Sequence, residues 1–272
     1  MAQFTTTTAP TFWVDGDSIS SSGGIVSAWV DKTGNASLNI VGGAPTVVPA
    51  PGTGNNAVSF NGTSDFLANT TVAGSTLFSD TATTIFIVEN DLSLNSSSVS
   101  FSWVGDTASP GTGHQAVAAI NDAGNIVFNQ GSNGSDLIQG AKPTDNNYHV
   151  LGLQRNDAGS SSISVDGSGL STSGAFAGGS VTTATPSQLT IGATANPGGS
   201  ASLFFNGTIA EILVFNYALN STETASVENY LGGKYGISVV PEPSQYATVF
   251  GVICVLAGVA VRVRRQQNGA AV

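Results

Sequence analysis

Short apolar runs alternate with small polar clusters along most of the chain. Between Phe12 and Ile237 each run is about 4 to 8 residues long, and Gly, Asn, Ser, Asp and Pro separate the runs. In the segment 161–166, Ile163 and Val165 fall on one face of an alternating pattern. The spacing is typical of an all-β sandwich or barrel. Strands are predicted at 25–30, 38–41, 57–60, 84–89, 99–104, 116–120, 125–129, 149–155, 161–166, 188–191 and 203–215.

One segment departs from the β pattern and predicts a helix over 221–234. Asn220 or Ser221 can cap its first turn, which contains Glu223. Gly232 with Gly233 is predicted to end it. Its apolar stripe consists of Ala225, Val227, Tyr230 and Leu231. No tandem repeat or long linker precedes Val239, so one domain is predicted over 12–238, after a short N-terminal segment 1–11.

The charge balance excludes several classes of protein. The chain holds 7 Lys and Arg against 17 Asp and Glu, and three of the basic residues are Arg262, Arg264 and Arg265 near the end. The body therefore lacks the basic surface that nucleic-acid backbones require. No phosphate-binding loop or dinucleotide-binding glycine motif is present. The single cysteine, Cys254, excludes an intramolecular disulfide and a cysteine-based metal cluster.

The C-terminal region has three parts in a fixed order. Pro241, Glu242 and Pro243 come first, then an uncharged segment over 244–261, then a basic tail over 262–272. Eighteen helical residues span roughly 27 Å, which suffices for a transmembrane helix. Basic residues after it favour a cytoplasmic C-terminus, with the acidic body across the membrane.

This arrangement over 239–272 resembles the PEP-CTERM sorting signal of Gram-negative bacteria; an ordinary tail anchor is the alternative. The resemblance implies transient membrane insertion and recognition by an exosortase, which would process the chain near Pro241, Glu242 and Pro243. It also implies that the body reaches the cell surface or the extracellular space. The opening MAQFTTTTAP does not supply a leader peptide, so we expect a leader to be missing, with Ala2 as the small residue of its cleavage site.

The body resembles the laminin G-like, concanavalin A-like jelly-roll domain of bacterial surface proteins. The resemblance rests on WVDG at 13–16, VSAWVDKTGN at 26–35, VSFNGTSDFL at 58–67 and FNGTIAEILVFNYALNSTETASVENYLGGKYGI at 205–237. It implies two antiparallel sheets packed as a jelly-roll sandwich. The expected fold is therefore an all-β jelly roll with one short helix near its end, followed by a transmembrane helix.

Catalytic motifs are missing from the sequence. Laminarinase-like enzymes of this fold carry paired carboxylates on one strand as ExDxxE, and this chain lacks the motif. Glu211 is the nearest candidate, and a structural role, at a strand edge or paired with Lys234, is the favoured interpretation. His114 and His149 belong to no HExxH motif and are expected to be hydrogen-bonded structural residues. We therefore expect no catalytic residue and no enzymatic activity.

Calcium is the metal ion that the polar loops would hold, since it prefers carboxylate and carbonyl oxygens. Asp and Asn also stabilise turns by themselves, and this is the favoured interpretation of the same residues. The calcium candidates are Asp15, Asp17, Asp65 and Asp91, with further oxygen donors at Asp31, Asn35 and Asn61. Trp13, Trp29 and Trp103 lie in strand-like segments and are expected in the core rather than as platforms for sugars.

The leading hypothesis is an exported adhesion or carbohydrate-binding module of a cell surface or extracellular matrix. Its expected partners are an extracellular polysaccharide or surface proteins. Two alternatives stay open at this point. One is an extracellular glycan-active hydrolase of the same fold, and the other is a structural surface or filament subunit that associates with itself through sheet edges.

Overall fold

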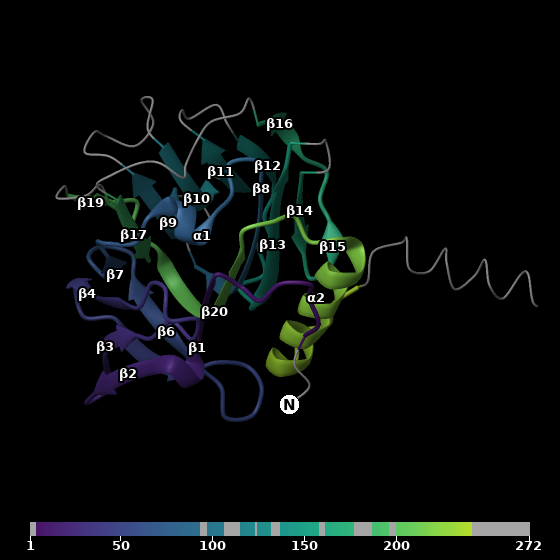
Figure 1. Ribbon diagram of the computed structural model, residues 1–272. Coiled ribbons are helices and arrows are strands. Elements are labelled where there is room, and N and C mark those ends of the chain that lie inside the picture. The colour runs from purple at the N-terminus through teal and green to yellow at the C-terminus, as the bar shows by residue number, and fades with distance from the viewer. Residues whose placement is uncertain are drawn as a thin grey trace, which may run out of the picture. The chain divides into compact units, whose positions relative to one another are not determined.

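The computed structural model describes residues 4–92, 97–105, 115–122, 124–131, 137–157, 161–176, 187–195 and 200–240 (Figure 1). Strands predominate in these residues, which confirms the predicted all-β class. The strands are β1 (Phe12–Asp15), β2 (Ile19–Ser22), β3 (Ile25–Trp29), β4 (Leu38–Gly42), β5 (Thr46–Pro49), β6 (Asn56–Asn61), β7 (Phe66–Asn69), β8 (Ala82–Asp91), β9 (Ser98–Gly105), β10 (Gln115–Asp122), β11 (Asn125–Gly131), β12 (Leu137–Ala141), β13 (His149–Asn156), β14 (Ser162–Val165), β15 (Ser168–Gly169), β16 (Ser173–Ala175), β17 (Ser187–Ile191), β18 (Thr194–Ala195), β19 (Ala201–Ser202) and β20 (Asn206–Phe215). The helices are η1 (Gly16–Ser18), α1 (Gly74–Leu77) and α2 (Ser221–Tyr235).

The strands pair antiparallel in two layers. In the first layer, called here the helix-side sheet, β15, β14, β13, β8 and β20 follow one another, and β1 and β6 also pair with β20. In the second layer, the opposite sheet, the order is β4, β7, β17, β9, β10, β11, β12 and β16. β3 pairs with β4 of the opposite sheet and with β5, and β5 pairs with β6 of the helix-side sheet. The strands β3 and β5 therefore link the two layers.

The main hydrophobic core lies between the two sheets. Ile85 and Ile87 enter it from β8, and Phe101 and Trp103 enter it from β9. All four side chains are fully buried, and each contributes about 2–3 kcal/mol relative to an exposed position. Trp29 is equally buried, so the prediction of core positions for Trp29 and Trp103 is confirmed.

A second apolar layer lies on the outer face of the helix-side sheet, where α2 covers it (Figure 1). Phe86, Leu213 and Phe215 point outward from the sheet and pack against Val227 and Leu231 of the helix. The central strands β8 and β20 are therefore apolar on both faces, which explains their continuous apolar runs.

The start of α2 follows from its sequence, but its end differs from the prediction. Asn220 Oδ1 accepts hydrogen bonds from the backbone N–H groups of Thr222 and Glu223, and Glu223 accepts one from the Asn220 N–H, as in a capping box. The prediction that Gly232 and Gly233 end the helix is wrong. The helix continues to Tyr235, and Gly236 ends it in the left-handed conformation at φ +66°.

Gly232 has a packing role instead. A side chain there would place its Cβ only 2.8 Å from the carbonyl oxygen of Ile237, where the chain folds back along the helix.

Contacts divide the chain into two units, 1–239 and 240–272. Only Val240 of the second unit belongs to the described residues. Among the helices that are described, none is long and apolar enough to cross a membrane. The predicted span over 244–261 lies outside the described part of the chain.

Candidate functional site

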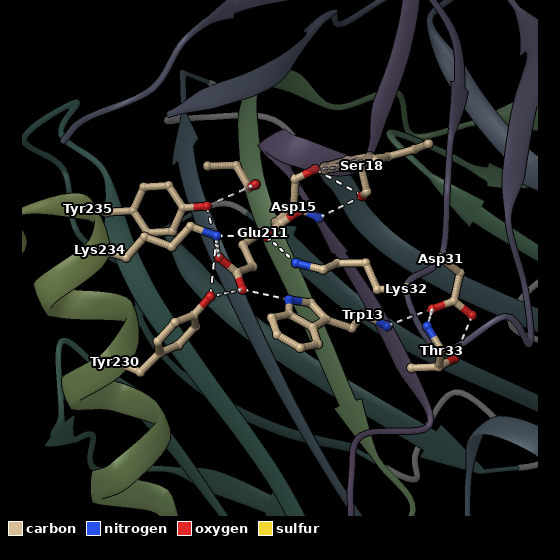
Figure 2. Close-up of polar contacts among 12 residues, drawn as sticks. Trp13, Asp15, Ser18, Asp31, Lys32, Thr33, Glu211, Tyr230, Lys234 and Tyr235 are labelled. Atoms are coloured by element: carbon tan, nitrogen blue, oxygen red, sulfur yellow. Dashed lines mark hydrogen bonds and ion pairs between the residues drawn. The ribbon is translucent and has the colours of Figure 1, made fainter. Parts of the chain in front are cut away.

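A buried charged network joins α2 to the helix-side sheet (Figure 2). Lys234 Nζ on α2 lies 2.8 Å from Glu211 Oε2 on β20 and 2.8 Å from Asp15 Oδ2 on β1. Lys32 Nζ contacts the same oxygen of Asp15 at 2.8 Å. The predicted pairing of Glu211 with Lys234 is thereby confirmed. The Glu211 network, as it is called below, comprises Trp13, Asp15, Lys32, Glu211, Tyr230, Lys234 and Tyr235.

Glu211 is fully engaged inside this network. Its Oε1 accepts hydrogen bonds from Trp13 Nε1 at 2.7 Å and from the Tyr230 hydroxyl at 3.2 Å. Its Oε2 accepts one from the Tyr235 hydroxyl at 2.9 Å in addition to the bond from Lys234. Figure 2 shows Tyr230, Lys234 and Tyr235 all pointing from the helix toward this carboxylate. Glu211 therefore fixes α2 on the sheet.

The shared lysine sets the charge states of the two carboxylates. Burial raises the pKa of Asp15, but the hydrogen bonds from Lys234 and Lys32 outweigh it and hold the pKa below its ordinary value. Burial raises the pKa of Glu211 above its ordinary value, because Lys234 compensates only part of that cost. Burial lowers the pKa of Lys234, but Glu211 and Asp15 outweigh it and raise that pKa, so the ammonium stays charged.

A cleft opens beside the network, between the N-terminal segment and the loop after β3. Its volume is about 610 Å³. Trp13 and Phe4 both line it, with 5.5 Å between their ring centroids. The Lys32 ammonium lies 4.0 Å from the Trp13 ring centre, and Asn35 lies exposed on the rim. We call this the N-terminal cleft; it is lined by Phe4, Thr5, Thr6, Ala9, Pro10, Trp13, Lys32, Thr33 and Asn35.

Trp13 departs from the expectation of a core position. Its side chain is only partly buried, and it separates the cleft from the Glu211 network. The order of apolar and polar residues does not reveal this role. Trp13 lies on β1 of the helix-side sheet, where the N-terminal segment leaves part of its ring uncovered.

The loop that forms one wall of the cleft is organised by Asp31. Its carboxylate accepts hydrogen bonds from the backbone N–H groups of Trp13 (2.9 Å), Thr33 (3.0 Å), Asn35 (2.8 Å) and Ala36 (2.8 Å), and from the Thr33 hydroxyl (2.7 Å). Asp31 is buried, so these bonds hold the loop in one conformation.

The structure does not bring the four calcium candidates together. Asp15 is paired with two lysines, and Asp91 is paired with Lys142. Asp65 accepts backbone N–H bonds from Ala44 and Asn61 and so stabilises its own loop. Asp17 is exposed. Among the described residues no group of three or more His, Cys, Asp or Glu side chains could hold a metal ion.

A second polar site lies at one end of the sandwich, and the sequence analysis missed it. Glu89 and Asp91 extend from the same face of β8, in line with the buried Ile85 and Ile87. Asn121 Nδ2 on β10 donates to Glu89 Oε1 at 2.9 Å. The alternation along β8 would have indicated two buried carboxylates, but not their partners, which come from the opposite sheet.

A pocket of about 20 Å³, large enough to hold one water molecule, is lined by Glu89, Asp91 and Lys142. Burial raises the pKa of Glu89 to about 7. Glu89 Oε2 is buried and has no hydrogen-bond partner among the described residues. A buried polar atom without a partner is energetically costly.

His149 also lines this pocket. Its Nδ1 lies 2.7 Å from Asp166 and its Nε2 lies 2.8 Å from Asp145. The hydrogen bond to Asp166 raises the pKa of His149 to about 9. The expectation of a hydrogen-bonded structural histidine is confirmed.

Several predicted site residues fall outside the described part of the chain. They are His114, Pro241, Glu242, Pro243, Cys254, Arg262, Arg264 and Arg265.

Residues 90–225, which are half of the chain, match the family model of the concanavalin A-like lectin/glucanases superfamily. The chain belongs to this superfamily. A comparison with curated protein sequences found no significant match. The fold assignment and the sequence resemblance to laminin G-like jelly rolls are thereby confirmed.

Solved structures with the same fold include both enzymes and binding domains. A Trypanosoma rangeli sialidase in complex with sialic acid matches at 17% identity with a TM-score of 0.54, over 80% of this chain and 32% of the sialidase. Botulinum neurotoxin type C, whose entry into cells depends on interaction with two ganglioside molecules, matches at 14% identity with a TM-score of 0.52, over 76% of this chain and 51% of the toxin chain. The binding domain of botulinum neurotoxin serotype D/C matches at 12% identity with a TM-score of 0.53, over 82% and 52%. This chain thus spans about a third of the sialidase and about half of the toxin chains.

The expectation of no enzymatic activity is corrected by this comparison. The sialidases among the structures that share the fold show that a chain of this architecture can belong to an enzyme. The expectation depended mainly on one motif, the paired carboxylates of laminarinase-like enzymes, and the lack of one motif does not exclude other activities on the same fold.

Proposed function

We propose that this chain is an exported surface protein that binds carbohydrate in the N-terminal cleft. The observation that carries the proposal is the composition of the cleft: a partly exposed Trp13 ring next to Lys32 and Asn35. An aromatic face packs against the apolar face of a sugar ring, and amide and ammonium groups donate hydrogen bonds to its hydroxyls. The superfamily includes lectins, and a toxin with the same fold is described with gangliosides.

The cleft also has the rigidity that sugar binding favours. Asp31 holds one wall through four backbone N–H groups. The Glu211 network fixes Trp13 from behind through the indole N–H. A site that is held in place before binding loses little conformational entropy when the sugar binds.

Filling the cleft tests the proposal without disturbing the network. Ala9 is exposed and lines the cleft, so Ala9→Trp is expected to weaken glycan binding at least tenfold, about 1.4 kcal/mol. Calorimetric titration with soluble β-glucans and with sialylated oligosaccharides measures the effect. The same mixtures are assayed for released reducing sugars and free sialic acid, which detects turnover.

The matched control is Ser22→Trp, which adds the same ring to an exposed position on β2 away from the cleft lining. It is expected to bind like the parent chain. Equal affinities of the Ala9→Trp and parent chains would refute the N-terminal cleft as the binding site.

Export is the second part of the proposal, and it is supported by the order of the Pro241–Glu242–Pro243 triplet, the apolar segment 244–261 and the basic tail. We expect protein recovered from the surface or medium of its host to lack everything after about Pro243. Intact-mass analysis with sequencing of the C-terminal peptide checks this. A recovered chain that still ends at Val272 would contradict processing by an exosortase.

A further inference from the structure

Lys142 and Asp91 form a buried contact between the two sheets. Asp91 ends β8 in the helix-side sheet, and Lys142 directly follows β12 in the opposite sheet. The Lys142 Nζ and Asp91 Oδ2 atoms are in direct contact, and the two side chains are only 3% and 7% exposed. The Lys142 backbone N–H donates to the Gly124 carbonyl at 3.0 Å, which fixes the base of the lysine.

Glu89 lies beside this pair, two residues before Asp91 on the same face of β8. Its Oε1 is held by Asn121, whereas its Oε2 has no partner among the described residues. Glu89 lines a small pocket together with Asp91 and Lys142. Ile126 and Leu151 supply apolar walls to that pocket. A buried ammonium, a buried carboxyl and a second carboxyl with one unpartnered oxygen therefore meet beside one small pocket.

We propose that Lys142 and Asp91 become joined by an isopeptide bond, formed within the folded chain with Glu89 carrying the proton. The arrangement supplies the three requirements of amide formation: an amine in contact with a carboxyl group, an environment with little water, and an acid–base group at the same place.

The reaction needs no oxidant, reductant or cofactor. A proton passes from the Lys142 ammonium to the Asp91 carboxylate, which leaves a neutral amine next to a neutral carboxylic acid. The nitrogen lone pair attacks Asp91 Cγ, forms the C–N bond and gives a tetrahedral intermediate. Glu89 accepts a proton from the nitrogen and returns it to the departing hydroxyl. The C–O bond breaks, and one water molecule leaves, for which the adjacent pocket has the volume.

The protonation behaviour of Glu89 fits this role. Burial raises its pKa to about 7, so at neutral pH both its acid and its base form are populated. A group whose pKa lies near the working pH gives and accepts a proton with comparable ease.

The bond would act as a covalent clamp in a chain that has no intramolecular disulfide, since it contains one cysteine. Lys142 and Asp91 are separated by 51 positions, and they belong to different sheets. Cross-linking such a long loop restricts the unfolded chain, as a disulfide does.

Mass spectrometry of the folded full chain tests the proposal without any variant. The intact mass is expected to fall below the mass of the sequence by one water molecule. Proteolysis is expected to yield the peptides that contain Asp91 and Lys142 as a single branched species. A chain with its full sequence mass, or one whose water loss maps to other residues, would overturn the proposal.

Three variants separate the bond from an ordinary ion pair. Lys142→Arg keeps the charge but cannot form the amide, so it is expected to keep its full mass and to melt about 10 °C lower. Glu89→Gln preserves the shape of the side chain and removes its proton transfer, so it is also expected to keep its full mass. Lys234→Arg alters the other buried lysine and is expected to lose one water molecule like the parent chain. A Glu89→Gln chain that still loses water would overturn the role of Glu89, and a Lys142→Arg chain that loses it would overturn the bond.

Discussion

Replacing Lys234 with Met is expected to lower the free energy of unfolding by about 3–5 kcal/mol. Lys234 bridges Glu211 and Asp15, and its side chain is 6% exposed. Methionine fills a similar volume, so the loss comes from leaving buried carboxylates without their counter-charge. Asp15 keeps Lys32, but among the described residues Glu211 has no second lysine or arginine. Urea-induced unfolding, followed by tryptophan fluorescence, measures the change.

Lys32→Met is the matched control, because the same substitution removes a cation from the same network at a position whose side chain is 34% exposed. An exposed ion pair contributes little, so we expect a loss of about 1 kcal/mol or less. A Lys234→Met chain no less stable than the Lys32→Met chain would contradict the assigned role of Lys234. Adding Glu211→Gln to Lys234→Met is expected to restore part of the lost stability, because the double variant no longer buries an unpaired carboxylate.

The parts of the fold that local sequence determines were predictable. Asn220 and Glu223 form the capping box of α2 within one helical turn, so four consecutive residues contain the signal. The ion pair of Glu211 with Lys234 was one of the two structural roles expected for Glu211, beside a place at a strand edge. The end of α2 was misjudged because glycine is read as a helix stop, whereas Gly232 is required by the close approach of Ile237.

The parts of the site that depend on sheet order were not predictable. Asp15 meets Lys234 across 219 positions, and this contact exists only because β1 pairs with β20 beneath the helix. Glu89 and Asp91 could be placed on one face of a strand, but Lys142 reaches them from the other sheet. A single sequence does not show which strands pair, so it does not show that these side chains lie close together.

The acidic loop residues show how one pattern supports two interpretations. Asp and Asn near glycine suggest calcium ligands, but the same side chains accept the backbone N–H groups of their own turns. The structure shows the second role for Asp31 and Asp65. Composition cannot separate the two, because both depend on the same carboxylate oxygens.

Asp31→Asn is expected to destabilise the chain by roughly 3 kcal/mol and to weaken glycan binding by the N-terminal cleft. The Asp31 carboxylate accepts from five donors, four of them backbone N–H groups. An asparagine amide has only one accepting oxygen, and its NH₂ group would face donors, so several buried N–H groups would lose their partner. The loop that includes Thr33 and Asn35 would then no longer hold the cleft wall in one conformation. Urea-induced unfolding and calorimetric titration measure the two effects.

Asp17→Asn provides the control, since it is the same substitution at an exposed carboxylate in η1, directly after β1. It is expected to change the free energy of unfolding by less than about 0.5 kcal/mol and to leave binding intact. If Asp31→Asn lowered stability while affinity stayed at the parent value, the loop would be a structural element only, and the cleft wall would not determine binding. If both fell together, the hydrogen bonds of one buried carboxylate would account for both the fold of the loop and the shape of the binding site.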